Sequence, residues 1–200
     1  MRVGIVCPYT WEVPGGVQAH IRDLAEALIA HGCHVSVIAP AADDAELPPY
    51  VTSAGRAVPV PYNGSVARLA FGFLSANRVR KWIREGRFDV LHVHEPAVPS
   101  LSMLACWAAR GPIVATFHAS LERSRAMAMA APVLQSILEK ITGRIAVSDA
   151  ARKTLVEHFG GDAVLIPNGV TVSRYAEGEP LPGWGPDGNV IGFLGRMDEP

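Results

Sequence analysis

Short apolar runs rich in β-branched residues alternate along this chain with stretches of helical periodicity. The first run, RVGIVC at 2–7, has no polar residue after Arg2. A continuous apolar run of this kind is typical of a strand covered on both faces of a parallel sheet. We expect further strands at 34–39, 90–94, 113–118, 144–147 and 163–166, with helices at 17–29, 74–85, 100–110, 131–141 and 149–159. This alternation predicts βαβ crossovers, and therefore an α/β fold with a doubly wound, Rossmann-like parallel sheet.

The chain is expected to contain one domain and the beginning of another. Hydrophobic residues make up 49% of its 200 residues and charged residues 18%, which is enough apolar material for a buried core. The Pro- and Gly-rich segment 178–188 predicts a linker, and NVIGFL at 189–194 predicts a fresh buried strand after it. We expect a first domain at 1–176, a linker at 177–188 and the start of a truncated second domain at 189–200.

Charge and cysteine usage exclude several functional classes. The net charge of −1 argues against a general polyanion binder, and without a recognition motif no nucleic-acid partner is expected. Cys7, Cys33 and Cys106 are odd in number and widely spaced, which argues against a disulfide framework or a zinc site and fits a reducing cytosol. No secretory signal is evident, and no apolar stretch reaches the roughly 18 residues of a spanning helix. Any contact with a membrane would be made from its surface.

The loop after the first strand could bind an anion. In open α/β sheets, ligands bind beyond the carboxyl ends of the strands. Gly15 and Gly16 precede the first expected helix, where a bare backbone, free N–H groups and the helix dipole suit a phosphate. A flexible turn is an equally good interpretation of the glycine pair alone. Neither the dinucleotide-binding fingerprint nor the P-loop motif occurs in the chain.

A polar, turn-rich segment at 61–68 is a second candidate. It places the amide of Asn63, the hydroxyl of Ser65 and the guanidinium of Arg68 within a few positions. Such a set suits a phosphorylated, polyhydroxylated ligand, because arginine binds phosphate through two parallel hydrogen bonds. The alternative, which composition alone favours, is a type I′ or II turn at Asn63-Gly64 with a solvated Arg68.

Three histidines lie at the expected strand ends. His92 and His94 share one face of a strand, so we considered a metallohydrolase. The pair lacks a convincing carboxylate and a third histidine, and metal binding is the minority interpretation. His118 ends the strand at 113–118, where catalytic residues of this architecture lie, with a core or capping role as the alternative. No G-x-S-x-G nucleophile elbow is present.

The helix expected at 74–85 has a basic face. Its basic residues, with one more just beyond it, are Arg78, Arg80, Lys81, Arg84 and Arg87. Val79, Trp82 and Ile83 form an apolar arc opposite them, and Phe71, Phe73 and Leu74 stand at or just ahead of its start. This pattern is suited to an anionic membrane surface. A solvated helix that packs by its apolar arc explains it equally well.

Seven short motifs together resemble one family, the retaining glycosyltransferases of family four, which have the two-domain GT-B fold. They are PGGVQ at 14–18, PYNGS at 61–65, HVHEP at 92–96, TFH at 116–118, AVS at 146–148, IPNGV at 166–170 and GR at 195–196. The similarity covers essentially the whole chain, as the N-terminal half of such a fold. Within the family, residues 62–68 and the basic helix most resemble those of the actinobacterial members that mannosylate phosphatidylinositol.

This resemblance implies a cytoplasmic, peripheral membrane enzyme of phospholipid metabolism that moves mannose from GDP-mannose to phosphatidyl-myo-inositol. It implies that His118 is catalytic, and that Gly16 and Arg196 bind the donor diphosphate. The implied acceptor-binding residues are Tyr9, Gln18, Tyr62, Asn63, Ser65 and Arg68, and the implied membrane patch is Arg78, Arg80, Lys81 and Arg84. Cationic side chains and aimed N–H groups would stabilise the leaving diphosphate, so no cofactor, obligatory metal or covalent nucleophile is expected.

Two other functions remain open. One is a transferase of the same fold that acts on a soluble sugar or inositol phosphate, and the other is a ligand- or lipid-binding domain without turnover. A nicotinamide dehydrogenase is disfavoured, because the fingerprint and a suitable acidic ribose ligand are absent.

The chain also departs from the family pattern. Ala119 lacks the hydroxyl expected there, and Asn77 replaces a basic residue. The sequence ends before the expected Arg-Lys pair and the acidic donor-binding motif, so the 200 residues alone are expected to be inactive without the C-terminal domain.

Overall fold

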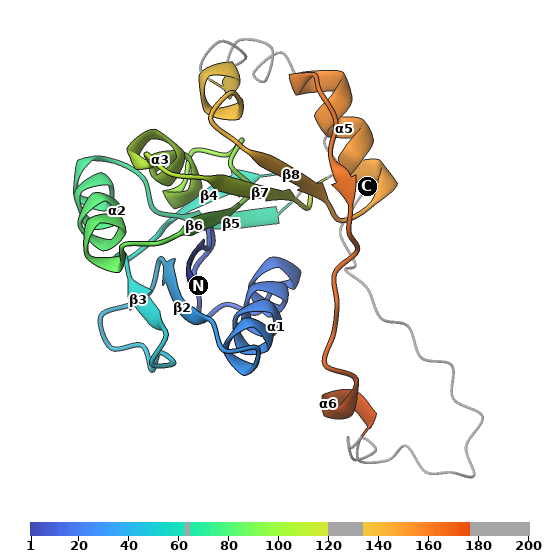
Figure 1. The fold of residues 1–200 in the computed structure, drawn as a ribbon. Helices are drawn as coiled ribbons and strands as arrows, with labels where there is room; N and C mark the ends of the chain where they lie inside the picture. The colour runs from blue at the N-terminus through green and yellow to red at the C-terminus, as the bar shows by residue number, and fades with distance from the viewer. Residues whose placement is uncertain (63–64, 120–133, 177–200) are drawn as a thin grey trace. The chain divides into compact units, whose positions relative to one another are not determined.

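The computed structural model describes residues 1–62, 65–119 and 134–176 (Figure 1). The chain divides into two compact units, 1–169 and 170–200. All the described strands belong to the first unit, and the short helix α6 (Val172–Ala176) is the described element of the second. The expected linker at 177–188 and the expected second domain at 189–200 lie outside the described residues, so the domain boundaries stay predictions.

Seven strands form one parallel sheet in the order β3-β2-β1-β6-β7-β8-β9. Their bounds are β1 Arg2–Val6, β2 His34–Ala39, β3 Val51–Ser53, β6 Val90–His94, β7 Ile113–Phe117, β8 Gly143–Ala146 and β9 Val164–Leu165. The helices of this unit include α1 (Gly16–Ala30), α2 (Phe73–Gly86), α3 (Leu101–Ala108) and α5 (Asp149–Phe159), and residues 134–138 are also helical. The predicted doubly wound α/β fold is confirmed.

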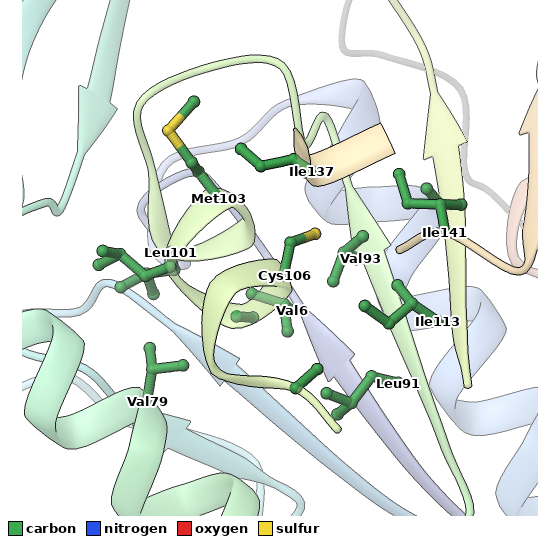
Figure 2. Packing of buried hydrophobic residues seen from close by; sticks show 14 of the residues in the cluster. Val6, Val79, Leu91, Val93, Leu101, Met103, Cys106, Ile113, Ile137 and Ile141 are labelled. Carbon is green, nitrogen blue, oxygen red and sulfur yellow. The ribbon is translucent and has the colours of Figure 1, made fainter. Parts of the chain in front are cut away.

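The two faces of the sheet bury separate apolar clusters, because alternate residues of each strand point to opposite sides. On one face, Ile5 of β1 packs in a cluster with Ile21 of α1. On the other, Val6 packs with Val79 of α2 and Leu101 of α3, and Figure 2 shows these three side chains in that cluster. A strand sandwiched in this way needs apolar residues at every position, which is why β1 is a continuous apolar run.

The segment 58–69 was predicted incorrectly as a loop at 61–68, since it forms a two-stranded antiparallel sheet. Strand β4 (Val58–Tyr62) pairs with β5 (Ser65–Leu69), with Tyr62 opposite Ser65. Pro59 and Pro61 hide the strand pattern, because proline cannot donate to a ladder and is tolerated only in edge strands. A separate two-stranded sheet consists of edges alone, so it accepts both prolines. Residues 63–64 lie outside the described residues.

The strand order reverses beside β1, which is where this architecture binds ligands. β1 pairs with β2 on one side and with β6 on the other. Strands are therefore added outward from β1 first on one side, as β2 and β3, and then on the other, from β6 to β9. The loops that leave β1 and β6 therefore diverge to opposite faces and leave a crevice at the carboxyl ends of the strands. The candidate site is expected at this switch point.

Ile5→Ala should lower the free energy of unfolding by about 2–5 kcal/mol, since a fully buried side chain is lost and its cavity refills incompletely. Chemical denaturation monitored by circular dichroism measures this. Ile29→Ala is the matched control, because Ile29 is 41% exposed on α1, and it should change stability far less. Equal effects of the two substitutions would contradict the position of Ile5 in the core.

Candidate functional site

The loop between β1 and α1 is held in place by buried polar side chains. The amide nitrogen of Gln18 donates hydrogen bonds to the carbonyls of Thr10 and Val13, both at 3.1 Å. Arg22 donates to the carbonyl of Trp11 at 2.8 Å, and its guanidinium lies 4.7 Å from the centroid of the buried Trp11 ring. The loop is thus preorganised. Gln18, predicted to bind the acceptor, is itself 7% exposed and uses its amide nitrogen to shape the loop.

Helix α1 begins with an open, uncapped N-terminus. Its N-cap, Gly15, makes no side-chain hydrogen bond, and a Cβ added to Gly15 would lie 2.5 Å from Oε1 of Gln18. A Cβ added to Gly16 would meet no atom within 4 Å. The first N–H groups of a helix have no partner within it, so they present partial positive charge to this open space. A phosphate or diphosphate suits such a position.

Four histidines converge beside this helix start. His92 and His94 lie on the face of the sheet that α1 covers, opposite to the Val93 side chain, and their rings stack at 4.5 Å. His118 follows β7, and its Nε2 is hydrogen-bonded to Nδ1 of His94 at 3.0 Å. His20 stands one turn into α1, with its ring centroid 5.3 Å from that of His118 and 5.6 Å from that of His94. Gly16 and His118 therefore belong to the same edge of the sheet.

These imidazoles are held in the neutral form. Burial is the main cause that lowers the pKa of His92 to about 4 and that of His118 to about 3, and the neighbouring histidines add charge repulsion. The pKa of His94 is lowered well below its usual value for the same reasons, and burial also lowers the pKa of His20. At neutral pH the cluster can accept or relay hydrogen bonds, but it carries no positive charge to offer a phosphate.

Glu95 fixes the backbone on which His118 stands. Its carboxylate accepts hydrogen bonds from the backbone N–H groups of His118 and of Ala119, the second at 2.7 Å. The residue is 3% exposed and has a φ of +50°, an uncommon backbone conformation for a residue with a side chain. Burial raises the pKa of Glu95 although the two N–H groups oppose this. The Glu95 side chain thus ties the end of β6 to the residues that follow β7.

The hairpin brings the second group of predicted residues to the first loop. Tyr9 bridges to Leu69, and the backbone N–H of Thr10 donates to the carbonyl of Arg68 at 3.2 Å. A hollow of about 420 Å³ opens beside this contact, lined by Thr10, Glu12, Ala42, Asp44, Arg56, Ala57 and Arg68. Arg68 is exposed there, and Arg56 forms an exposed ion pair with Asp43 at 3.3 Å. Two guanidinium groups and the carboxylates of Glu12 and Asp44 therefore border the hollow.

Several of the other predicted residues are only partly described. Tyr62 and Ser65 lie in the hairpin strands, where the structure gives their backbone alone, and Asn63 and Arg196 lie outside the described residues. What each of these residues binds remains a prediction.

Helix α2 presents the basic face that the sequence predicted. Arg80, Lys81 and Arg84 are exposed, whereas Val79 and Trp82 are buried against the sheet. Arg78 differs, because its guanidinium donates to the carbonyl of Ala54 at 2.8 Å and so anchors the helix. At the start of the helix, two apolar side chains are unusually exposed, Phe73 at 91% and Leu74 at 75%. In the part of the chain that the structure describes, no helix is long and apolar enough to span a bilayer.

Sequence reasoning missed two members of this site, His20 and Glu95. His20 is four positions after Gly16, a spacing that places both on one side of the helix, and this could have drawn attention to His20. Glu95 directly follows a strand, but no pattern reveals that its carboxylate reaches the end of the next strand. The three cysteines are free, and Cys7 and Cys106 are buried.

Glu95→Ala should destabilise the protein by up to about 6 kcal/mol, because it leaves two partly buried N–H groups without an acceptor, at up to about 3 kcal/mol each. Glu95→Gln should be much milder, since its side-chain carbonyl can accept the same bonds. Denaturant unfolding measures the stability, and amide hydrogen exchange at His118 and Ala119 locates the change. If alanine and glutamine were equally destabilising, the carboxylate would act in some other way.

The chain is similar to named enzymes over its full length. It is 56% identical over 200 residues to the phosphatidyl-myo-inositol mannosyltransferase of Mycolicibacterium smegmatis, covering all of this chain and 52% of that protein. The proteins of the same name from Mycobacterium tuberculosis H37Rv and Propionibacterium freudenreichii are 54% and 41% identical, with 53% and 55% of their lengths covered. The chain thus spans about half the length of the curated relatives that it matches.

Solved structures support the fold. A glycosyltransferase from Rickettsia africae superposes with a TM-score of 0.56 at 18% identity, over 89% of this chain and 46% of that one. Sucrose-phosphate synthase from Thermosynechococcus elongatus superposes with a TM-score of 0.53 at 16% identity, over 86% of this chain and 49% of that one. These likenesses confirm the predicted half of a GT-B fold.

The model of glycosyltransferase family 4 matches residues 14–174, which run from the glycine pair of the first loop to helix α6. This range includes the helix start at Gly16, the histidine cluster and the hairpin. The chain belongs to glycosyltransferase family 4.

Proposed function

We propose that the full-length protein transfers mannose from GDP-mannose to phosphatidyl-myo-inositol at the cytoplasmic face of the membrane. The observation that carries the proposal is the convergence of the open helix start at Gly16 with His118 at the switch point of the sheet. The names and identities of the relatives supply the substrate class. The donor and acceptor of this chain are part of the proposal.

The helix start would receive the donor diphosphate. Transfer of a sugar from a nucleotide builds negative charge on the departing diphosphate while the sugar carbon becomes cationic. The unpaired N–H groups at the start of α1 would stabilise that charge without moving, and the absence of a side chain at Gly16 lets a ligand approach the backbone. By its family motif, Arg196 would add a full positive charge.

His118 would act beside the transferred sugar as a neutral hydrogen-bonding group. Its low pKa means that it is uncharged at neutral pH, so it can donate one hydrogen bond and accept another, but it does not act as a cation. His94 orients the ring through the 3.0 Å hydrogen bond, and Glu95 holds the backbone. Positioning of this kind lowers a barrier because the reacting groups need not be reorganised.

The hollow bordered by Arg68 would hold the inositol phosphate of the acceptor. Arginine suits a phosphate diester, and the hydroxyls of an inositol ring require many polar partners. Tyr9 directly precedes Thr10, which lines the hollow. By the family resemblance, Tyr62, Asn63 and Ser65 would add polar partners. Gln18 would act mainly by shaping the loop, because its amide nitrogen is already engaged.

The acceptor is a lipid, so the enzyme must reach a membrane surface, and α2 is suited to this. Arg80, Lys81 and Arg84 would face anionic headgroups, while Phe73 and Leu74 would enter the interface. Exposed apolar residues next to a basic face favour a membrane over the alternative of a soluble acceptor, for which they have no use.

His118→Ala in the full-length protein should lower mannosyl transfer by at least about 100-fold, as expected for loss of a positioned hydrogen-bonding group beside the reacting atoms. Thin-layer analysis of mannosylated lipid, made from labelled GDP-mannose and phosphatidylinositol vesicles, measures this. His31→Ala, at the exposed end of α1, is the control and should keep wild-type activity. A fully active His118→Ala protein with an unchanged circular dichroism spectrum would remove the role assigned to His118.

Replacing Arg80, Lys81 and Arg84 together by glutamine should weaken binding to anionic vesicles by about 100-fold at low salt, at about 1 kcal/mol per charge. Co-sedimentation with phosphatidylinositol-containing vesicles measures the affinity. Lys153→Gln, an exposed lysine on α5, should leave it unchanged. Wild-type binding that does not depend on anionic lipid or salt would instead favour a soluble acceptor.

A further inference from the structure

We propose that His20, His94 and His118 form a binding site for a transition-metal ion of the Zn²⁺ type. Each residue offers one ring nitrogen, and the three nitrogens all lie within 4.8 Å of one another. They come from α1, from the end of β6 and from the residue after β7, so three separate elements meet at one point. His20 joins His94 and His118 as the third histidine, which the sequence pattern did not reveal. His92 is not part of the group, since its Nε2 pairs with Oγ1 of Thr116 at 2.7 Å.

The spacing of the rings is close to that of bound zinc. With zinc–nitrogen bonds of about 2.05 Å, two ligands of a tetrahedral ion lie about 3.3 Å apart. Nδ1 of His94 and Nε2 of His118 are already 3.0 Å apart. The other nitrogen–nitrogen distances, which are at most 4.8 Å, must shorten for all three nitrogens to bind one ion. His20 and His118 are only half-buried, so a rotation of their rings can provide this.

The two ring nitrogens of His94 have different surroundings, and Nδ1 is the one that faces His118. Nε2 of His94 is buried and has no hydrogen-bond partner among the residues that the structure describes, which is a costly state for a polar atom. Coordination through Nε2 gives that atom the partner that it lacks. If His94 binds the ion through Nδ1, the ion takes the place of the proton in the hydrogen bond between Nδ1 of His94 and Nε2 of His118.

The surroundings hold two of the ligands before any ion arrives. Ser102 Oγ donates to the carbonyl of His94 at 2.5 Å, and Glu95 holds the backbone N–H of His118. Preorganised ligands lose little freedom on binding, and groups behind the ligands strengthen metal sites. Three histidines with one open position suit Zn²⁺ and Co²⁺, whereas Mg²⁺ and Ca²⁺ require oxygen ligands.

An ion at this position would bind the ring of His118, which the proposed transfer requires to be free. Zn²⁺ is therefore expected to inhibit the enzyme reversibly, and this consequence rests on the proposed function. The binding site itself does not, so the two can be tested separately.

Metal binding is measured on the full-length protein after treatment with a chelator. Co²⁺ is titrated in while the visible absorption of four-coordinate Co²⁺ is recorded, and Zn²⁺ is then added to displace it. One equivalent is expected, and His20→Ala should weaken binding at least about tenfold, since even a residue behind a ligand costs about 10–100-fold. His31→Ala, at the C-cap of the same helix, is the matched control. His20→Asn replaces His20→Ala if circular dichroism shows that the alanine variant is unfolded.

The outcomes separate the site from the function. Absence of the Co²⁺ spectrum, or a spectrum that His20 variants leave unchanged, would overturn the site. In the transfer assay, Zn²⁺ should inhibit the wild type, a chelator should reverse this, and His20 variants should resist it relative to their own metal-free rates. Equal inhibition of wild type and His20 variants would overturn the inhibitory role, whereas a metal-free protein that makes no product would contradict the proposed function alone.

Discussion

The parallel pairing of β1, β6 and β7 is the constraint on which the candidate site depends. Its register sets Ile5 beside His92, and His94 beside Thr116, so the strands end at one level. Parallel strands direct their carboxyl ends to the same edge, and the reversal of strand order beside β1 keeps that edge open. The residues that follow each strand are therefore gathered without any specific attraction between them. The polar groups at this edge lie close together because the strands pair, and burial of the two apolar clusters drives that pairing.

The edge is stabilised by polar side chains that serve the backbone. Gln18 donates to two loop carbonyls, Glu95 accepts from two N–H groups after β7, and Ser102 donates to the carbonyl of His94. A buried polar group without a partner is costly, so each of these contacts resists any movement that would break it. The result is a rigid support beneath Gly16 and the half-buried His118. Rigid support of this kind is what positional and electrostatic catalysis requires.

Helix α2 differs from this edge, because its basic side chains and two apolar side chains at its start are exposed to solvent. The inner side of this helix packs against the sheet through Val79 and Trp82, whose indole N–H donates to Ser36 at 2.9 Å. Its outer side has no such partner in the described part of the chain. Burial thus fixes the orientation of the helix, and the orientation decides which residues can meet a surface outside the protein. The hydrogen bond from Arg78 to the carbonyl of Ala54 helps to fix this orientation.

The sequence by itself determined the α/β class, most of the strands of the main sheet and the family, because apolar periodicity and short loop motifs are local properties of a chain. It also predicted Gly16 and His118 as site residues, since both stand at predictable ends of elements. Only the tertiary structure decided that 58–69 is a hairpin, that Gln18 and Arg78 serve the fold, and that His20 and Glu95 belong to the site. Those facts depend on which distant segments become neighbours. That choice is made by the packing of the whole sheet, and no local pattern records it.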